Sequence, residues 1–390
     1  MLSEESAAVV RATLPVVAAQ LDTITARFYD TMFADRPELL DGLFNRGNQR
    51  SGEQRRALAG SIAAFATMLL EHPDERPDMM LSRIAHKHAA VGVTEDQYVI
   101  VHKYLFGAIA EVLGDAVTPD VAAAWDEVYW LMAGALIAIE SRMYAAAGAE
   151  GGRTWRTWQV VERREETPDA VSLLLRPLGD EPVPPALPGQ YVSIRVRMPD
   201  GVHQLRQYTL SGEGDDGLRR VTVKRVADGE VSALLHATVE EGDELTLSAP
   251  FGDVALRDGD APLVLVSAGI GCTPITAMLG HLARTGDPRS VLLLHADRDV
   301  TSHPLRADMT RLAAAAGAEQ VLWYERDAPE GARTGLMDLA GVRIPEGAQV
   351  YMCGPVPFMR AVRGDLIRAG VAPKDIHYEV FGPDLWLGAA

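Results

Sequence analysis

The sequence predicts a multidomain protein in which an all-α domain is followed by an antiparallel β-barrel domain and a doubly wound α/β domain. Apolar residues recur with helical spacing from residue 3 to about 147. From residue 153 to about 260 the pattern changes to short alternating segments between Pro, Gly and Asp turns, and afterwards apolar strands alternate with helical stretches. Because 390 residues are too many for one ordinary core, we expect three domains, at residues 1–147, 153–260 and 261–390.

The individual elements follow from the same patterns. The clearest helical segments are residues 53–70, 79–92, 95–113 and 119–146, and the small-residue run 145–152 favours a boundary linker. Residues 190–196 and 219–225 alternate as strands of a small antiparallel barrel or sandwich do. The apolar stretches 263–267, 291–295, 321–324 and 350–353 are typical of parallel strands in a doubly wound sheet.

Composition and charge exclude several classes of protein. The 47% of hydrophobic residues is too high for a disordered chain, and a net charge of -17, spread along the sequence, repels nucleic acid and anionic lipid. The longest clearly apolar run, residues 129–139, is shorter than the roughly 20 residues of a membrane-spanning helix. The first residues lack the basic and apolar regions of a signal peptide. We expect a soluble cytoplasmic protein without a membrane span or a nucleic-acid partner.

The chain has two cysteines, Cys272 and Cys353. Two thiols are too few for a disulfide framework, a cysteine zinc site or an iron-sulfur cluster.

A histidine in the helical part is placed as a haem ligand would be. On a helix, His88 shares a face with Leu81, Ile84 and Val91, whereas His86 points roughly the opposite way. An imidazole on an apolar face is the axial ligand that a haem of globin type requires. The alternative is a core histidine whose ring is satisfied by a backbone carbonyl.

Two residues on later helices could reach the outer nitrogen of that imidazole. They are Tyr98 and Glu140, the latter isolated after a strongly apolar stretch. A carboxylate there fixes the imidazole tautomer and raises its basicity, which strengthens donation to iron. The alternative for Glu140 is an exposed residue near the end of its helix.

Polar groups for the opposite face of a haem are also present. Tyr29 lies in an early helix, and Gln54 shares a face with Leu58 and Ile62. A hydroxyl and an amide in an apolar pocket can donate hydrogen bonds to iron-bound dioxygen, while Phe44 would wedge against the porphyrin. An ordinary helical core could contain the same aromatic residues.

The segment Arg206-Gln-Tyr-Thr-Leu210 suits a flavin. Strand alternation places Arg206 and Tyr208 on one side and Thr209 on the other, which divides pyrophosphate pairing, ring stacking and a hydrogen bond toward flavin N5. Lys224 and the run 229–232 support this prediction, since Ser232 could cap a helix whose N-terminal amides receive a diphosphate.

A nicotinamide dinucleotide site is predicted at the ends of the later strands. Gly269-Ile-Gly-Cys-Thr-Pro274 joins strand 263–267 to helix 275–283, and its glycines permit close approach of backbone to phosphate. Cys353-Gly-Pro355 ends another strand of the same sheet. Both cysteines could lie near the nicotinamide or be buried structural thiols. Asp297 favours NADH and the adjacent Arg298 favours NADPH, so the choice stays open.

Over essentially its whole length the chain resembles the flavohaemoglobins, in which a globin is fused to a ferredoxin-reductase-like FAD and NAD(P)H module. The matching globin motifs are Phe28-Tyr29, Phe44-Asn45, Asn48-Gln-Arg50, Lys87-His88, Tyr98 and Glu140. The matching reductase motifs are Pro188-Gly-Gln-Tyr191, Arg206 to Thr209, Gly269 to Pro274, Cys353-Gly-Pro355 and Tyr378-Glu-Val-Phe-Gly-Pro383. Thr209 replaces a common serine, Val380 replaces a frequent cysteine, and His86 adds an imidazole.

The resemblance implies a role for each matching residue. His88 is the proximal iron ligand with Tyr98 and Glu140 as its relay, and Tyr29 stabilises bound dioxygen. Lys87 and Glu379 face each other near the haem and the flavin and tune their potentials. Motifs and resemblance together assign cofactor binding to Phe44, Tyr191, Arg206, Gln207, Tyr208, Thr209, Lys224, Gly229, Val231, Ser232, Gly269, Ile270, Gly271, Cys272, Thr273, Pro274, Cys353, Gly354, Pro355, Val380, Phe381, Gly382 and Pro383.

The activity that the resemblance implies is that of a nitric oxide dioxygenase. Haem b, FAD and NADH or NADPH would be its cofactors, and O2 and NO its substrates, in a monomer whose distal haem pocket is a candidate site for a lipid or an azole-type ligand. One alternative is an O2 or NO sensor or carrier that its own reductase keeps ferrous. Another is a general flavin reductase with an altered helical domain.

Overall fold

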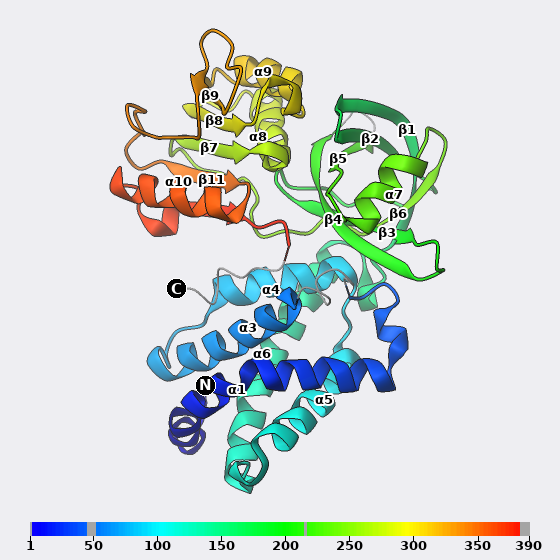
Figure 1. The fold of residues 1–390 in the computed structure, drawn as a ribbon, viewed down its shortest axis with the longest axis vertical. Coiled ribbons are helices and arrows are strands. Elements are labelled where there is room, and N and C mark those ends of the chain that lie inside the picture. The colour runs from blue at the N-terminus through cyan, green and yellow to red at the C-terminus, as the bar shows by residue number, and fades with distance from the viewer. Residues whose placement is uncertain (1, 45–51, 214–216, 383–390) are drawn as a thin grey trace. The chain divides into compact units, whose positions relative to one another are not determined.

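The computed structural model describes residues 2–44, 52–213 and 217–382. The chain forms two compact units (Figure 1). The first comprises Met1–Trp155, Arg195–Arg206 and Gly382–Ala390, and the second comprises Arg156–Ile194 and Gln207–Phe381. The predicted fold class, with helical, barrel and parallel-sheet parts, is confirmed.

In the part of the first unit that the structure describes, five long helices form the core. They are α1 (Glu4–Asp35), α3 (Glu53–Glu71), α4 (Asp78–Val91), α5 (Glu95–Leu113) and α6 (Pro119–Ala146), with short turns η1 (Pro37–Leu40), η2 (Gly114–Ala116) and η3 (Glu150–Gly152). The sequence marks several of their ends. Thr94 and Gln97 form a capping box at α5, and Thr118 caps α6 just before Pro119. The predicted helical segments therefore match the observed bounds to within one residue.

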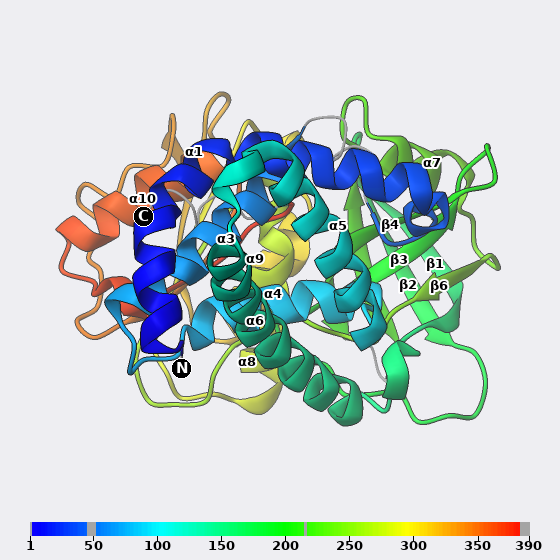
Figure 2. The ribbon, with the colours of Figure 1, turned by 90° about the horizontal axis from the view of Figure 1, so that it is seen from below.

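The long helix α1 bends along its course (Figure 2). Pro15 lies inside it, and a proline removes one helical hydrogen bond and pushes its ring against the preceding turn. Beyond the proline, Ile24, Phe28 and Met32 are buried in the core that α1 shares with α3, α5 and α6.

By length and composition, α1 and α6 are apolar enough to cross a membrane. Both contribute side chains to the core of the helical unit, for example Phe28 from α1 and Val128 from α6. Core helices of soluble proteins pass the same test, so these two carry little weight for a membrane span.

The barrel is closed and has six strands in the order β1-β2-β5-β4-β3-β6. The strands are β1 (Arg156–Thr167), β2 (Ala170–Pro177), β3 (Tyr191–Arg197), β4 (His203–Glu213), β5 (Arg219–Lys224) and β6 (Glu244–Leu247), and α7 (Glu230–Thr238) follows β5. Closure removes the exposed edges that an open sheet would leave, which settles the alternative between barrel and sandwich.

The C-terminal sheet is parallel, in the order β10-β9-β8-β7-β11-β12. Its strands are β7 (Leu263–Ala268), β8 (Val291–Asp297), β9 (Glu319–Tyr324), β10 (Arg333–Thr334), β11 (Gln349–Cys353) and β12 (Ile376–Glu379). The helices are α8 (Cys272–Thr285), α9 (Arg306–Ala315) and α10 (Val356–Arg368), with turns η5 (Gly269–Gly271), η6 (Val300–Ser302) and η7 (Pro373–Asp375). The strand order reverses between β7 and β11, and ligands of such sheets bind at the strand ends beside that point.

An ion-pair cluster joins the barrel to α9 within the second unit. Asp308 accepts hydrogen bonds from Arg164 at 3.2 Å, from Arg311 at 3.0 Å and from Arg220. Burial by itself would raise the pKa of Asp308, but the hydrogen bonds from these arginines outweigh burial and lower the pKa to about 2.

We predict that Asp308→Asn destabilises the second unit. The folded pKa lies below the value of about 3.9 for an unfolded chain, so the stabilisation is present at neutral pH and is lost as pH falls from about 4 to about 2. At pH 7 the variant should lose about 1–2 kcal/mol of unfolding free energy, measured by urea titration. Asp365→Asn, which removes an exposed pair with Arg368, is the control and should cost less than about 0.5 kcal/mol. Equal losses in the two variants would contradict the prediction.

Candidate functional site

Three helices of the first unit meet at one hydrogen-bonded group. Nδ1 of His88, on α4, lies 2.9 Å from the Tyr98 hydroxyl on α5 and 2.9 Å from Oε1 of Glu140 on α6. The Tyr98 hydroxyl donates to the same carboxylate oxygen at 2.7 Å. Glu140 is buried, so the alternative of an exposed glutamate is wrong.

The electrostatics of this group fix the state of the imidazole. Burial, followed by the charge of Glu140, raises the pKa of Tyr98 far above its usual range, so the phenol keeps its proton. A carboxylate can only accept hydrogen bonds, so we assign a proton to Nδ1 of His88. Nε2 then carries a lone pair. The His88 side chain is partly exposed, so its second nitrogen can be reached by a ligand.

Tyr29, on α1, belongs to an aromatic cluster in the core of the helical unit. Its ring centroid lies 4.6 Å from that of Phe28, 5.5 Å from that of Phe33 and 5.9 Å from that of Phe44. Burial raises the pKa of Tyr29 well above its usual range, with nearby Arg55 opposing the shift. Gln54 is half-buried on α3. The motif residues Asn45 and 48–50 lie outside the described residues.

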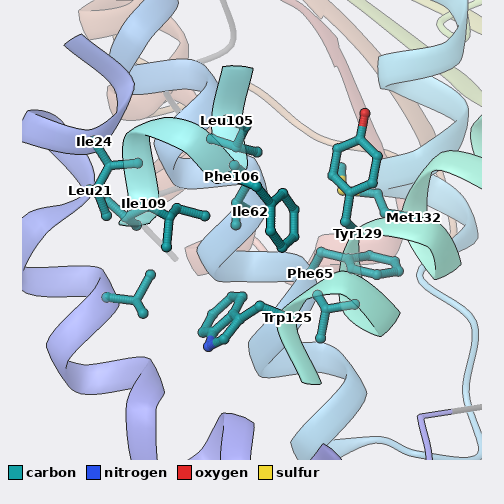
Figure 3. A pocket seen from close by; sticks show the side chains of 12 residues that line it. Leu21, Ile24, Ile62, Phe65, Leu105, Phe106, Ile109, Trp125, Tyr129 and Met132 are labelled. Carbon is teal, nitrogen blue, oxygen red and sulfur yellow. The ribbon is translucent and has the colours of Figure 1, made fainter. Parts of the chain in front are cut away.

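An apolar cavity of about 40 Å³, partly open to solvent, lies among α1, α3, α5 and α6. Side chains from all four helices converge on it, and Tyr129 presents its ring there (Figure 3). The Tyr129 hydroxyl donates to the Tyr98 backbone carbonyl at 2.6 Å. The sequence reasoning missed Tyr129 and Trp125. Their only signal was helical spacing on the apolar face of residues 119–146, which ordinary core residues share.

The predicted tuning residues have different surroundings. Nζ of Lys87, on α4, donates to the Gly382 carbonyl at 3.0 Å within the first unit. Glu379 ends β12 and is buried. Val380 is buried and Phe381 is about half exposed, while Pro383 lies outside the described residues. The opposition of Lys87 and Glu379 stays a prediction.

The flavin segment lies on β4 as predicted, with Thr209 buried and Arg206 and Tyr208 half-buried. Gln207 donates to the Ser193 hydroxyl on β3 at 2.9 Å. Tyr191 begins β3 and is buried. The motif therefore occupies two neighbouring strands of the barrel, where its side chains can meet one ligand.

The predicted role of Ser232 as a helix cap is wrong. Helix α7 begins at Glu230 with Gly229 as its N-cap, and Val231 and Ser232 already lie inside its first turn, both buried. The Ser232 hydroxyl instead accepts from the Val226 amide at 3.1 Å. A Cβ on Gly229 would lie 2.8 Å from that hydroxyl, so the glycine is required by the turn. Lys224 lies 3.6 Å from Asp169 in the same region.

The turn between β7 and α8 is shaped for close approach of a ligand to the backbone. Gly269 has a φ of +53° and open space where a Cβ would be, whereas a Cβ on Gly271 would lie 2.3 Å from the Cys353 carbonyl oxygen. The motifs 269–274 and 353–355 therefore pack against each other at the switch point, the place between β7 and β11 where the strand order reverses. Ile270 lies in this turn, Thr273 and Pro274 lie in the first turn of α8, and Gly354 and Pro355 lead into α10. The turn presents backbone amides at a helix N-terminus, which suits a diphosphate.

Both thiols lie in the core rather than at a surface. Cys272 and Cys353 are buried, and burial raises the pKa of each thiol far above its usual range. The Cys272 thiol donates to the Pro304 carbonyl at 3.4 Å. These positions favour structural thiols, with backbone atoms left to contact a nicotinamide.

Comparison with known proteins gives the chain its family. Three family models match: Globin over residues 26–136, Oxidoreductase FAD-binding domain over 159–255, and Oxidoreductase NAD-binding domain over 265–364. The flavohemoprotein of Bordetella pertussis is 42% identical over 403 residues, which cover 98% of this chain and 99% of the relative. This chain belongs to the flavohemoprotein family. The flavohemoprotein of Deinococcus radiodurans is 41% identical, over 98% of both chains.

Solved structures agree with this membership. A flavohemoglobin from Malassezia yamatoensis, determined with bound FAD and heme, superposes with a TM-score of 0.93 at 41% identity and covers 98% of this flavohemoprotein and 100% of its own chain. The FAD/NAD-binding domain of a nitric oxide dioxygenase from Vibrio cholerae is 36% identical, with a TM-score of 0.57, over 59% of this chain and 100% of that domain.

We predict that Glu140→Gln raises the Fe(III)/Fe(II) midpoint potential of the haem-loaded flavohemoprotein. The amide keeps a hydrogen-bond acceptor but loses the charge that makes His88 electron-rich, so ferric iron is less favoured. If the preference of the site for ferric over ferrous iron falls tenfold, the midpoint potential rises by about 60 mV. A spectroelectrochemical titration resolves a change of this size.

Tyr144→Phe is the matched control for that measurement. It lies one turn further along α6, where burial, and after it the charge of Glu140, raise the pKa of its hydroxyl. This hydroxyl donates to the Val93 carbonyl at 2.7 Å; the phenylalanine removes it and leaves the carboxylate charge in place. A potential that moves equally in both variants, or in neither, would rule out a specific effect of the carboxylate.

Proposed function

We infer that this protein is a nitric oxide dioxygenase that oxidises NO to nitrate with O2, using electrons from NAD(P)H. One observation carries the inference: a histidine with a carboxylate and a phenol on its outer nitrogen lies in the same chain as FAD- and NAD-binding domains. The Vibrio cholerae relative, whose title names a nitric oxide dioxygenase, and the Malassezia yamatoensis structure with FAD and heme support it.

The residues of the first unit fit a haem. His88 would ligate the iron through Nε2, while Glu140 and Tyr98 hold the ring and its Nδ1 proton. On the other face, the buried Tyr29 hydroxyl stays protonated and donates a hydrogen bond to the oxygen substrate. Gln54 supplies an amide for the same purpose, and Phe44 packs beside Tyr29.

The second unit fits the two nucleotides. When bound, FAD would supply the conversion of a hydride from NAD(P)H into single electrons, and haem would supply the oxygen chemistry that turns NO into nitrate. The turn 269–274 receives the dinucleotide diphosphate, and β4 together with the start of α7 receives that of the flavin. Since a hydride carries two electrons and each NO oxidation uses one, each NAD(P)H supports the oxidation of two NO molecules.

The finer expectations about partners belong to the same proposal. We place the protein in the cytoplasm as a monomer, with O2 and NO as its substrates. The apolar lining of the cavity among α1, α3, α5 and α6 supports an apolar guest in the helical unit, such as a lipid chain or an azole-type ligand.

The test is NAD(P)H consumption by the haem- and FAD-loaded protein in air, with and without NO, together with nitrate analysis. We expect NO to stimulate consumption and nitrate to form in a two-to-one ratio to NAD(P)H. A sensor or carrier would show no sustained stimulation.

His88→Ala should abolish the Soret band and the NO-stimulated turnover, because the imidazole is the proposed iron ligand. Electron transfer from NAD(P)H to ferricyanide, which does not use the haem iron, serves as the control for folding and should persist. Nitrate formation that survives in this variant would overturn the proposal, and a general flavin reductase would show no Soret band even in the unchanged protein.

A further inference from the structure

We propose that Arg298 binds the 2'-phosphate of NADPH, so that the protein accepts NADPH as its hydride donor. The inference rests on the proposed function in one respect, that the C-terminal sheet binds a nicotinamide dinucleotide. It concerns the choice between NADH and NADPH, which the adjacent Asp297 and Arg298 leave open in the sequence.

The position of the two residues follows from the sheet. Strand β8 follows β7 and α8 and pairs with β7, as the second strand of the nucleotide-binding half. In such sheets the residue at the end of the second strand meets the adenosine ribose, where an acidic side chain accepts from the 2'-hydroxyl and an arginine accommodates a 2'-phosphate. Asp297 is the last residue of β8, and Arg298 follows it.

The Asp297 carboxylate is turned into the domain. Its side chain is 3% exposed, and Oδ1 accepts from the Arg298 amide at 2.8 Å and from the Ser302 hydroxyl at 3.0 Å. Oδ2 is buried, 3.7 Å from Nε2 of the buried His295. To accept a ribose hydroxyl, Oδ1 would have to give up its two donors, or the buried Oδ2 would have to turn out toward solvent, so the carboxylate does not act as the usual selector for NADH.

The other carboxylate of the loop is also engaged. Oδ2 of Asp299 accepts from Nε and Nη2 of Arg326 at 3.0 and 2.8 Å, and Oδ1 accepts from the Ser302 amide at 2.9 Å. The pKa of Asp299 is lowered, with hydrogen bonds from Thr301 and Arg326 as the main causes. Both oxygens of Asp299 are therefore engaged, and its negative charge offsets the positive charge of Arg326.

Arg298 is an accessible cation directly after the strand end. Its side chain is 52% exposed, and its guanidinium lies 3.4 Å from Oδ2 of Asp169, a long contact. That carboxylate also lies 3.6 Å from Lys224 and accepts from the Thr167 hydroxyl at 2.8 Å through its other oxygen. A phosphate dianion offers shorter, bidentate hydrogen bonds, so it can draw the guanidinium away from Asp169. Arg306, exposed at the start of α9, adds a second cation to the same loop.

The experiment measures binding to the FAD-loaded protein without NO. Isothermal titration compares adenosine 2',5'-bisphosphate with adenosine 5'-monophosphate, and NADP+ with NAD+. We expect the 2'-phosphate to tighten binding about tenfold in the unchanged protein, and this advantage to shrink as salt is raised. Equal Kd values for the two adenosine phosphates would overturn the proposal.

Two variants should change the preference in opposite directions. Arg298→Gln should remove the advantage of the bisphosphate while leaving the Kd of the monophosphate within about twofold. Asp169→Asn removes the competing carboxylate and should increase that advantage. Arg368→Gln is the control, because Arg368 ends α10, and helices of such folds end at the opposite edge of the sheet.

A preference for the 2'-phosphate that survives in Arg298→Gln would overturn the assignment. Because no step of the binding assay uses haem, O2 or NO, a failure of the proposed oxygenase activity would leave its result unchanged. The two proposals can therefore fail separately.

Discussion

The Glu140 carboxylate is the point on which the helical unit depends chemically. One of its oxygens accepts from both His88 and Tyr98, which joins α4, α5 and α6 through a single buried charge. An unpaired buried carboxylate is costly, so the packing of three helices and the orientation of the imidazole are specified by the same two hydrogen bonds. Glu140, which orients the proposed iron ligand His88, therefore also contributes to the packing of the helical core. Its two roles cannot be separated by mutation without a control such as the Tyr144 hydroxyl.

In the second unit the corresponding constraint is that Gly271 has no side chain, which lets two strand ends approach each other closely. A Cβ on Gly271 would lie 2.3 Å from the Cys353 carbonyl oxygen, so alanine at this position would force apart the two strand ends that frame the switch point. The backbone geometry that admits a diphosphate therefore follows from close packing of β7 and β11. Charged side chains are gathered elsewhere. Those around Asp308 join the barrel to α9, and those at the end of β8 include Arg298, the proposed selector of NADPH.

The sequence predicted a residue's role well where its contacts are with near neighbours along the chain, and poorly where they cross a turn. Helical spacing predicted the bounds of α5 and α6, and Thr94 with Gln97 and Thr118 with Pro119 mark the same starting points, since capping involves neighbours in sequence. Helical spacing placed His88 on an inward face, whereas Tyr98 and Glu140 were chosen for their place on later helices and for the family resemblance. Ser232 was misjudged because its hydroxyl bonds back to Val226 across a turn that propensity does not specify. The direction of Asp297 depended on Ser302, and no periodicity encodes such a pairing.

The small-residue run 145–152 shows why a linker inferred from composition can be part of a fold. Ala149 is buried and its amide donates to the Tyr144 carbonyl at 2.8 Å, while a Cβ on Gly152 would lie 3.2 Å from the Gly92 carbonyl oxygen. The glycines therefore permit close packing against the end of α4 rather than free rotation. Residues 195–206 also belong to the first unit, where the His203 amide and imidazole both bond to the Asp41 carboxylate. A cut after residue 155 would remove those partners from Asp41, so the helical unit is completed by chain that lies far beyond its apparent boundary.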